Sequence, residues 1–90
     1  MSKAVDVTVT GRVQGVSFRY YAEREAQRYG VTGWVRNEPD GSVAGHFEGD
    51  DADVDALVEW CRSGPPMAHV QHVAVREGHH DGLTSFGVRF

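Results

Sequence analysis

The sequence contains a single cysteine, Cys61, and no run of apolar residues that approaches the length needed to cross a membrane. One cysteine excludes a disulfide within the chain and is typical of proteins kept in a reducing compartment. The residues near Met1 lack the long apolar centre of a secretory signal. These absences predict a cytoplasmic protein with no membrane partner, and the span from Met1 to Phe90 is expected to be complete rather than a fragment.

Basic residues are also in the minority, with nine Lys and Arg against thirteen Asp and Glu and a formal net charge of −4. This balance opposes the sequence-independent attraction that draws proteins to nucleic acid, so we expect no nucleic-acid partner. Any anion must then be bound by a local arrangement of groups. The length suffices for one compact domain with one core, residues 1–90, and a monomer is the default expectation.

The spacing of apolar residues changes along the chain and predicts an alternation of strands and helices. Val5, Val7 and Val9 alternate with polar residues, which is the period of a strand with one buried face. In chain order, the predicted elements are a strand at 5–10, a helix at 18–29 ended by Gly30, strands at 31–36 and 43–49 joined by a hairpin turn, a helix from Asp50 or Asp51 to residue 63, a strand at 69–76 with a bulge near Gln71, and a short strand at 86–90. This β-α-β-β-α-β order plus a short C-terminal strand predicts an α+β fold, the ferredoxin-like α/β sandwich, with an antiparallel-rich sheet and two helices on one face. The order leaves the place of the last strand in the sheet open.

The stretch GRVQGVSFRYY, from Gly11 to Tyr21, connects the first strand to the first helix. Unpaired N–H groups and the helix dipole favour an anion at a helix N-terminus, and glycines allow the loop to turn those N–H groups inward. Arg19, in the first helical turn, has a planar guanidinium that can bind two oxygens of a phosphate or a carboxylate. The same residues also fit an ordinary turn followed by a solvated arginine. The stretch has neither the dinucleotide pattern GxGxxG nor a Walker A loop, so no nucleotide cofactor or magnesium is predicted.

Two longer motifs make a family resemblance specific. The segment VTGRVQGVSFR, at Val9–Arg19, and the segment GWVRNEPDGSVAGHFEG, at Gly33–Gly49, occur in this order within the predicted elements. They resemble the two signature motifs of the acylphosphatase family, and the resemblance extends over nearly the whole chain. It implies hydrolysis of the carboxyl–phosphate bond of a small-molecule acyl phosphate, giving a carboxylate and inorganic phosphate, without a metal or a cofactor.

The resemblance also implies roles for particular residues. Arg19 corresponds to the catalytic arginine that binds phosphate, and Asn37 corresponds to the asparagine that positions the attacking water. The backbone N–H groups that would form the phosphate-binding loop are those of Gln14, Gly15, Val16, Ser17, Phe18 and Arg19. Taken alone, an asparagine at the start of a turn is typical of a residue that bonds its own backbone.

Two other classes of function stay open at this point. A non-catalytic phosphate- or anion-binding module of the same fold would keep the loop without turnover. An RNA-binding module would present exposed aromatic residues and a basic face on the sheet. The first strand instead has Asp6, Thr8 and Thr10 on its polar side, and the net charge is negative, so the RNA-binding hypothesis ranks last.

The histidines are interpreted as structural or solvated residues. His46 alternates with apolar neighbours and is predicted to be an exposed strand residue. His79, His80 and Asp81 are adjacent in a turn-rich segment, where neighbouring side chains point apart, and no further ligand stands at a defined spacing. We therefore predict a solvated turn there rather than a metal site.

Cys61 and the tryptophans are assigned to the core. Cys61 lies on the apolar stripe of the second helix, which favours a buried, unreactive thiol. Trp34 and Trp60 are predicted to cover the core rather than to stack on nucleic-acid bases.

Overall fold

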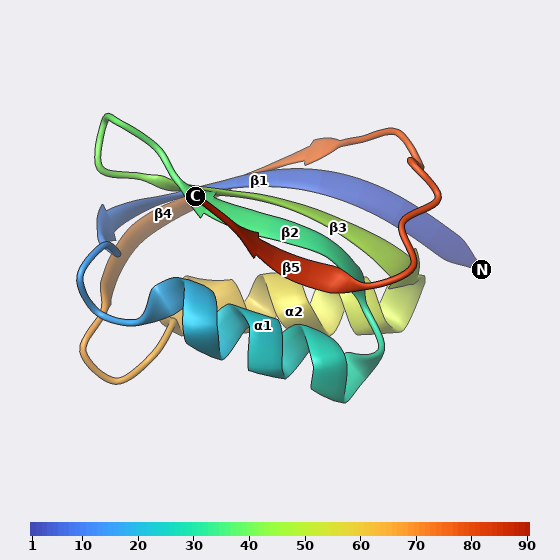
Figure 1. Cartoon of the computed structure of the whole chain (residues 1–90), viewed down its shortest axis with the longest axis horizontal. Coiled ribbons are helices and arrows are strands. Elements are labelled where there is room, and N and C mark those ends of the chain that lie inside the picture. The colour runs from blue at the N-terminus through green and yellow to red at the C-terminus, as the bar shows by residue number, and fades with distance from the viewer.

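The computed structural model describes all 90 residues and has two helices packed on one face of a five-stranded sheet (Figure 1). The elements, in chain order, are β1 (Ser2–Arg12), α1 (Phe18–Tyr29), β2 (Thr32–Asn37), β3 (Val43–Asp50), α2 (Asp51–Ser63), β4 (His69–Glu77) and β5 (Phe86–Arg89). The predicted α+β fold and the predicted order of elements are confirmed, with bounds that differ by a few residues. None of the helices is both long and apolar enough to span a bilayer.

The alternating valines of β1 explain why the sheet turns one face toward the helices. Val5, Val7 and Val9 are all buried, as their period of two predicted. They belong to one core cluster with the apolar stripes of both helices, formed by Phe18, Ala22 and Ala26 of α1 and by Val54, Leu57, Val58 and Cys61 of α2. Gly30 ends α1 in the left-handed conformation, with φ 71°, so that helix stops where the sequence predicted.

The strands lie in the order β4-β1-β3-β2-β5. All neighbouring strands are antiparallel except β2 and β5, which pair in parallel. The last strand, whose place the sequence left open, therefore forms an edge beside β2. Its pairing sets Val88 opposite Val35 and Arg89 opposite Arg36, so the chain ends level with Asn37, the last residue of β2.

Gly11 lies inside β1 rather than in the loop before α1, so this loop is shorter than predicted. Gly11 pairs with Val70 and the preceding residue pairs with His72, which leaves Gln71 unpaired and confirms the predicted bulge. Gly11 has φ 121°, and a Cβ atom at this position would lie 2.2 Å from the carbonyl oxygen of His69. This glycine therefore serves the close approach of β1 and β4, not the loop.

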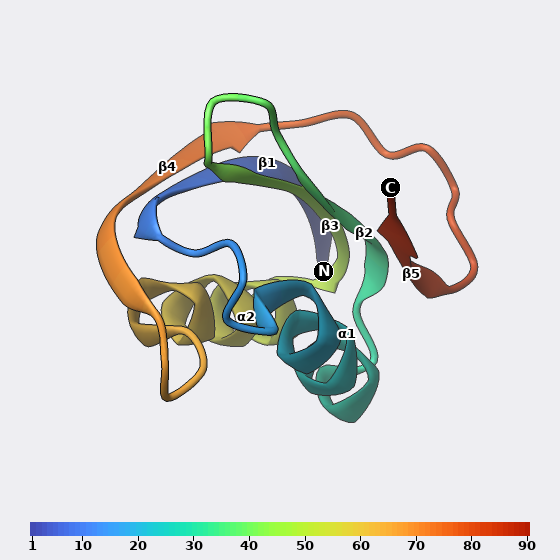
Figure 2. The ribbon, with the colours of Figure 1, turned by 60° about the vertical axis from the view of Figure 1, so that its left-hand side comes forward.

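The segment 78–85, between β4 and β5, crosses the face of the sheet that the helices leave uncovered (Figure 2). It has to cross because β4 and β5 are the two opposite edges of the sheet. Part of this second face is therefore buried without any helix above it.

Trp34 lies on the second face and not in the core. The next residue, Val35, belongs to the core, so the alternation of β2 turns Trp34 away from the helices. Its ring stacks on His46 with 6.2 Å between the ring centres. The prediction that Trp34 covers the core is therefore wrong, whereas Trp60 does pack against the core cluster.

Candidate active site

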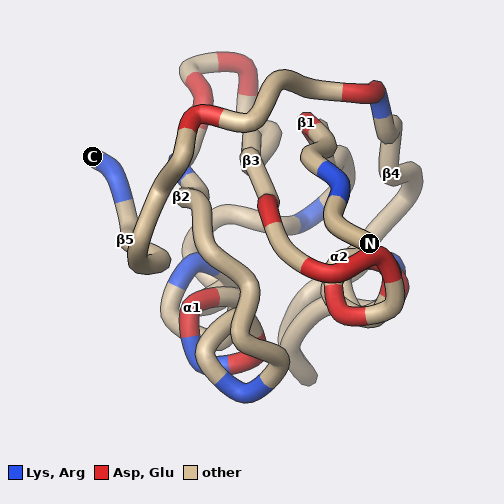
Figure 3. The backbone as a smooth tube through the Cα atoms, turned by 90° about the vertical axis from the view of Figure 1, so that its right-hand side faces the viewer, with Lys and Arg blue, Asp and Glu red and all other residues tan.

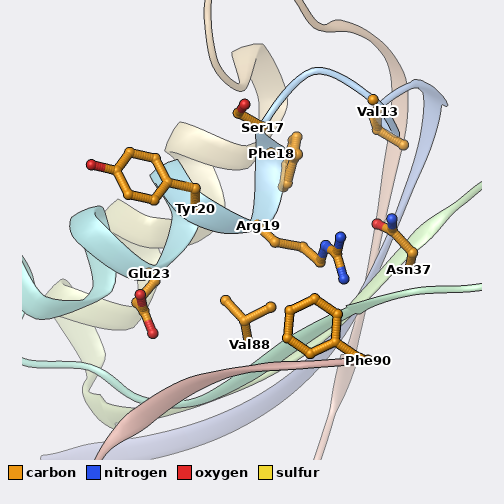
Figure 4. A pocket seen from close by; sticks show the side chains of 10 residues that line it. Val13, Ser17, Phe18, Arg19, Tyr20, Glu23, Asn37, Val88 and Phe90 are labelled. Carbon is orange, nitrogen blue, oxygen red and sulfur yellow. The ribbon is translucent and has the colours of Figure 1, made fainter.

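A pocket of about 700 Å³ opens between the start of α1, the end of β2 and β5. Arg19 and Asn37, which are far apart in the sequence, both line it, and Figure 4 shows their polar ends directed toward each other. Asn37 reaches this position because it is the last residue of β2, at the edge of the sheet where α1 begins. The lining residues are Val13, Gly15, Ser17, Phe18, Arg19, Tyr20, Glu23, Asn37, Val88 and Phe90.

Two left-handed residues shape the loop that leads into α1. Gly15 has φ 73° and Ser17 has φ 61°, and Ser17 is the only residue other than glycine with a positive φ in the chain. Left-handed residues that alternate with ordinary ones turn successive N–H groups toward one side, which makes a concave site for an anion. A serine in this conformation costs about 1–3 kcal/mol, and such strain is concentrated at ligand sites.

The backbone N–H groups of residues 14–19 donate to no acceptor within the protein. The first hydrogen bond of α1 runs from the N–H of Tyr21 to the oxygen of Ser17, at 3.2 Å. The loop is nevertheless held in place, because the side chains of Val16 and Phe18 are buried in the core cluster. A fixed loop with a run of unpaired donors at a helix N-terminus is suited to bind an anion.

Gln14 fixes the loop to the β2–β3 hairpin through its side chain. Its Nε2 donates to the carbonyl oxygen of Glu38 at 2.8 Å and to that of Ser42 at 2.9 Å. Glu38 is the residue after Asn37, so these two bonds set the distance between the loop and Asn37. The sequence pointed only to the backbone N–H of Gln14, and nothing in it indicated this bracing by the side chain.

Arg19 has no carboxylate partner. Its Nη1 donates only a long hydrogen bond, 3.4 Å, to the carbonyl oxygen of Arg89, and its guanidinium lies 4.8 Å from the centre of the Phe90 ring. The aromatic ring supports the cation without neutralising it. Most of the donors of this guanidinium are therefore free to bind a ligand in the pocket.

Asn37 presents an unpaired oxygen. Its Oδ1 is buried and accepts no hydrogen bond from the protein. The turn is instead closed by Asp40, whose Oδ1 accepts from the N–H and the hydroxyl of Ser42 at 2.9 and 2.6 Å. These bonds hold the pKa of Asp40 below its usual value. A buried polar atom without a partner is costly, so the Oδ1 of Asn37 is suited to accept a hydrogen bond from water or substrate.

The sequence-based analysis missed five residues of the pocket wall, namely Val13, Tyr20, Glu23, Val88 and Phe90. Glu23 could have been found, because it lies four residues after Arg19 and so on the same side of the helix. Val88 and Phe90 could not, because their place depends on the parallel pairing of β5 with β2.

On the opposite face of the sheet, His46 is only 3% exposed, so the prediction of an exposed histidine is wrong. Its Nδ1 lies 2.7 Å from Asp6 Oδ1, and its Nε2 lies 2.6 Å from Glu48 Oε2 and 3.6 Å from Asp81 Oδ2. We call Asp6, His46, Glu48 and Asp81 the His46 cluster. Burial disfavours the imidazolium, but the hydrogen bonds to Glu48 and Asp6 outweigh it and raise the pKa of His46.

Cys61 is buried among the apolar residues of α2, as predicted. Burial raises the pKa of its thiol to about 12. The thiolate, which is the reactive form, is therefore scarce at neutral pH, and the thiol takes no part in the pocket.

The sequence profile of the family named Acylphosphatase matches residues 5–88 of the chain. The chain is 70% identical over 89 residues to an acylphosphatase of Nocardioides sp., a match that covers 99% of this chain and 90% of that protein. The matched region of the chain includes the loop at residues 14–19 and Asn37.

Solved structures of two proteins have the same fold. An acylphosphatase from Coxiella burnetii superimposes with a TM-score of 0.94 at 36% identity, covering 98% of this chain and 93% of that one. An acylphosphatase from Bacillus subtilis superimposes with a TM-score of 0.94 at 34% identity, and the match covers both chains completely.

Proposed function

This chain belongs to the acylphosphatase family, and we propose that it binds the phosphoryl group of its substrate with Arg19 and the loop at residues 14–19, while Asn37 positions the attacking water. The enzyme hydrolyses the carboxyl–phosphate bond of acyl phosphates. The observation that carries the assignment of residues is that four loop residues with unpaired N–H groups line one pocket with Asn37, whose Oδ1 is also unpaired. These four are Gly15, Ser17, Phe18 and Arg19, whereas Gln14 and Val16 do not line the pocket. The alternative of a non-catalytic anion-binding module is not favoured.

The loop supplies fixed donors for the phosphoryl oxygens. Because the N–H groups of residues 14–19 have no acceptor in the protein, they can donate to the non-bridging oxygens without breaking any internal bond. Donors that are already oriented stabilise the charge of the transition state at little cost of reorganisation. The two left-handed residues, Gly15 and Ser17, hold this arrangement before the substrate arrives.

Arg19 supplies the positive charge. Its guanidinium can donate to two phosphoryl oxygens at once, and the ring of Phe90 and the carbonyl of Arg89 restrict its orientation. No acidic side chain has to be displaced first, because Arg19 forms no ion pair. We assign Arg19 as the catalytic residue that neutralises the transferring phosphoryl group.

Asn37 holds the nucleophile. Its Oδ1 can accept a hydrogen bond from water and its Nδ2 can donate one, and neither group titrates. A water bound by the buried Oδ1 would stand beside a phosphoryl group held by Arg19, in position for attack on phosphorus. The bond from phosphorus to the carboxyl oxygen then breaks. The leaving carboxylate is stable at neutral pH, so no acid is needed to protonate it, and we propose that catalysis requires no metal or cofactor.

The wider setting of the enzyme is also part of the proposal. We propose that the enzyme acts as a monomer formed by a single domain at residues 1–90, a length that suffices for one core. The free, buried Cys61 is consistent with a cytoplasmic location, and the net charge of −4 gives no reason for a nucleic-acid partner.

The variant Asn37→Ala tests the division of roles. Hydrolysis of benzoyl phosphate, followed by the loss of its absorbance, should slow by about 100-fold or more, because the water loses its position. The inhibition constant of inorganic phosphate should stay within about threefold of the original value, because the loop and Arg19 remain. Glu38→Gln is the matched control, since that side chain pairs with Arg36 outside the pocket.

Two results would contradict the role of Asn37. Turnover close to that of the unmodified enzyme would mean that the water is positioned by another group. An equal loss of turnover and of phosphate inhibition would mean that Asn37 binds the phosphoryl group itself.

A further inference from the structure

The His46 cluster gathers the metal-ligating atoms of four residues from three separate segments of the chain. Asp6 comes from β1, His46 and Glu48 come from β3, and Asp81 comes from the segment that crosses the sheet. One ligand atom each of His46, Glu48 and Asp81 lies within 4.8 Å of the other two. Nitrogen and carboxylate oxygen in this combination are ligands that Zn²⁺ and similar cations accept, with a further position left for water.

The cluster carries more negative charge than its own groups can balance. Three carboxylates face one imidazole, so the sum is −2 even when His46 is protonated. No Lys or Arg forms an ion pair with any of the three carboxylates, although Arg76 pairs with Asp6 in the β1–β4 register. Glu48 is only 5% exposed, so water does not fully solvate this excess negative charge. Figure 3 shows that acidic residues also gather at the start of α2.

Two of the three ligands are already oriented by partners of their own. The Nδ1 of His46 faces Asp6 at 2.7 Å, which directs Nε2 toward Glu48 and Asp81. The carboxylate of Glu48 accepts hydrogen bonds from the N–H of Asp81 at 2.7 Å and from that of Leu83 at 3.4 Å. Histidine and carboxylate ligands of metals are characteristically held by such outer partners.

We propose that His46 Nε2 and the carboxylates of Glu48 and Asp81 bind a divalent cation of the zinc class. The site lies on the face of the sheet opposite the helices and takes no part in hydrolysis. The cation replaces the proton on Nε2, and this proton goes to solvent. Asp81 is 60% exposed in its side chain, so the cation enters from the solvent side, past the crossing segment. Binding fastens the segment 78–85 to β3 through one ion.

Zinc titration of the tag-free, chelator-treated chain tests the site. Calorimetry should show one Zn²⁺ bound per chain, and thermal unfolding should shift upward by at least about 4 °C at saturating Zn²⁺. Co²⁺ should give visible absorption bands, and Mg²⁺, which prefers oxygen ligands, should bind far more weakly. Asp81→Asn, on the exposed segment, should fold normally and weaken Zn²⁺ binding by at least about tenfold, and Asp6→Asn should weaken it by about 10- to 100-fold.

The neighbouring histidines provide a matched control. His79 and His80 are exposed in the same segment, and neither belongs to the cluster. A chain with both changed to Gln should keep the Zn²⁺ affinity of the unmodified protein. The proposal is overturned if the unmodified chain binds no Zn²⁺, if Asp81→Asn binds it with unchanged affinity, or if the double His79→Gln, His80→Gln variant loses it. His46→Gln should abolish the cobalt bands, and bands that survive in this variant also overturn it.

Discussion

The two faces of the sheet hold polar sites of opposite sign. On the helix side, the pocket has an excess of donors and positive charge, because Arg19 and the N–H groups of residues 14–19 have no acidic partner. On the other side, the His46 cluster sets three carboxylates around one imidazole. The first arrangement favours an anion and the second favours a cation. The two proposed ligands therefore have opposite charges and bind on opposite faces of one sheet.

The two sites are also held together by different forces. The pocket depends on backbone conformation, since the left-handed Gly15 and Ser17 shape its loop. The His46 cluster depends on ion pairs between side chains, in which each partner offsets the cost of burying the charge of the other. A change in the pocket should therefore alter turnover and leave the fold intact, whereas a change in the cluster should alter the stability of the fold.

The largest expected effect is that of Arg19→Ala on turnover. The loss of a charged, two-pronged donor from the transition state should slow the hydrolysis of benzoyl phosphate by about 1,000-fold or more and abolish inhibition by phosphate. Arg19→Lys should also be severely impaired, because an ammonium cannot donate in the same planar geometry. The free energy of unfolding should change by no more than about 0.5 kcal/mol, since Arg19 forms no ion pair.

Arg24→Ala is the control for Arg19, because Arg24 lies on the same helix, 5.8 Å from the centre of the Tyr20 ring, and does not line the pocket. Its turnover should match that of the unmodified enzyme. Either of two results would contradict this contrast between the pocket and the cluster. Arg19→Ala could keep most of its turnover, or its free energy of unfolding could fall well beyond the expected change of about 0.5 kcal/mol.

The next effect is that of His46→Leu on stability. Removal of the imidazole leaves the buried carboxylate of Glu48 with no positive partner. The metal-free chain should therefore lose about 3 kcal/mol of unfolding free energy in urea denaturation. The double variant His46→Leu, Glu48→Leu should recover part of this loss, because it removes the uncompensated charge as well. A single variant as stable as the unmodified chain would show that the cluster does not hold the second face together.

The sequence predicted the pocket far better than the cluster, for a physical reason. The loop at residues 14–19 is contiguous, and glycine, arginine and a helix N-terminus carry their geometry in local sequence. Asn37 entered only through the resemblance to a family, since its place opposite Arg19 depends on how the sheet is assembled. The contacts of Gln14 with the hairpin join segments 24 and 28 residues apart, and no local pattern indicates them.

The errors about His46 and Trp34 have different causes. The prediction placed Trp34 in the core although the alternation of β2, in which Val35 faces the helices, turns it away. For His46 the alternation correctly predicted a position outside the helix-facing core, but not its burial. The alternation cannot predict that the segment 78–85 crosses the face opposite the helices and buries residues there. That crossing follows from β4 and β5 being opposite edges of the sheet, and the sequence left the position of β5 open. The bulge at Gln71 was predictable because a break in the alternation is itself a local signal.

The smallest predicted effect concerns Glu23, the one acidic residue in the wall of the pocket. Its carboxylate lies one helical turn after Arg19 and forms no ion pair, so it opposes the binding of an anion and does not hold the arginine. Glu23→Gln should therefore lower the inhibition constant of phosphate by about two- to fivefold at low ionic strength, and the gain should fade as salt screens the charge. Glu25→Gln is the control, because that side chain faces Arg28 outside the pocket. Weaker phosphate binding in Glu23→Gln would show instead that the carboxylate positions Arg19, and the pocket would then not be the purely donor-rich site that sets it apart from the His46 cluster.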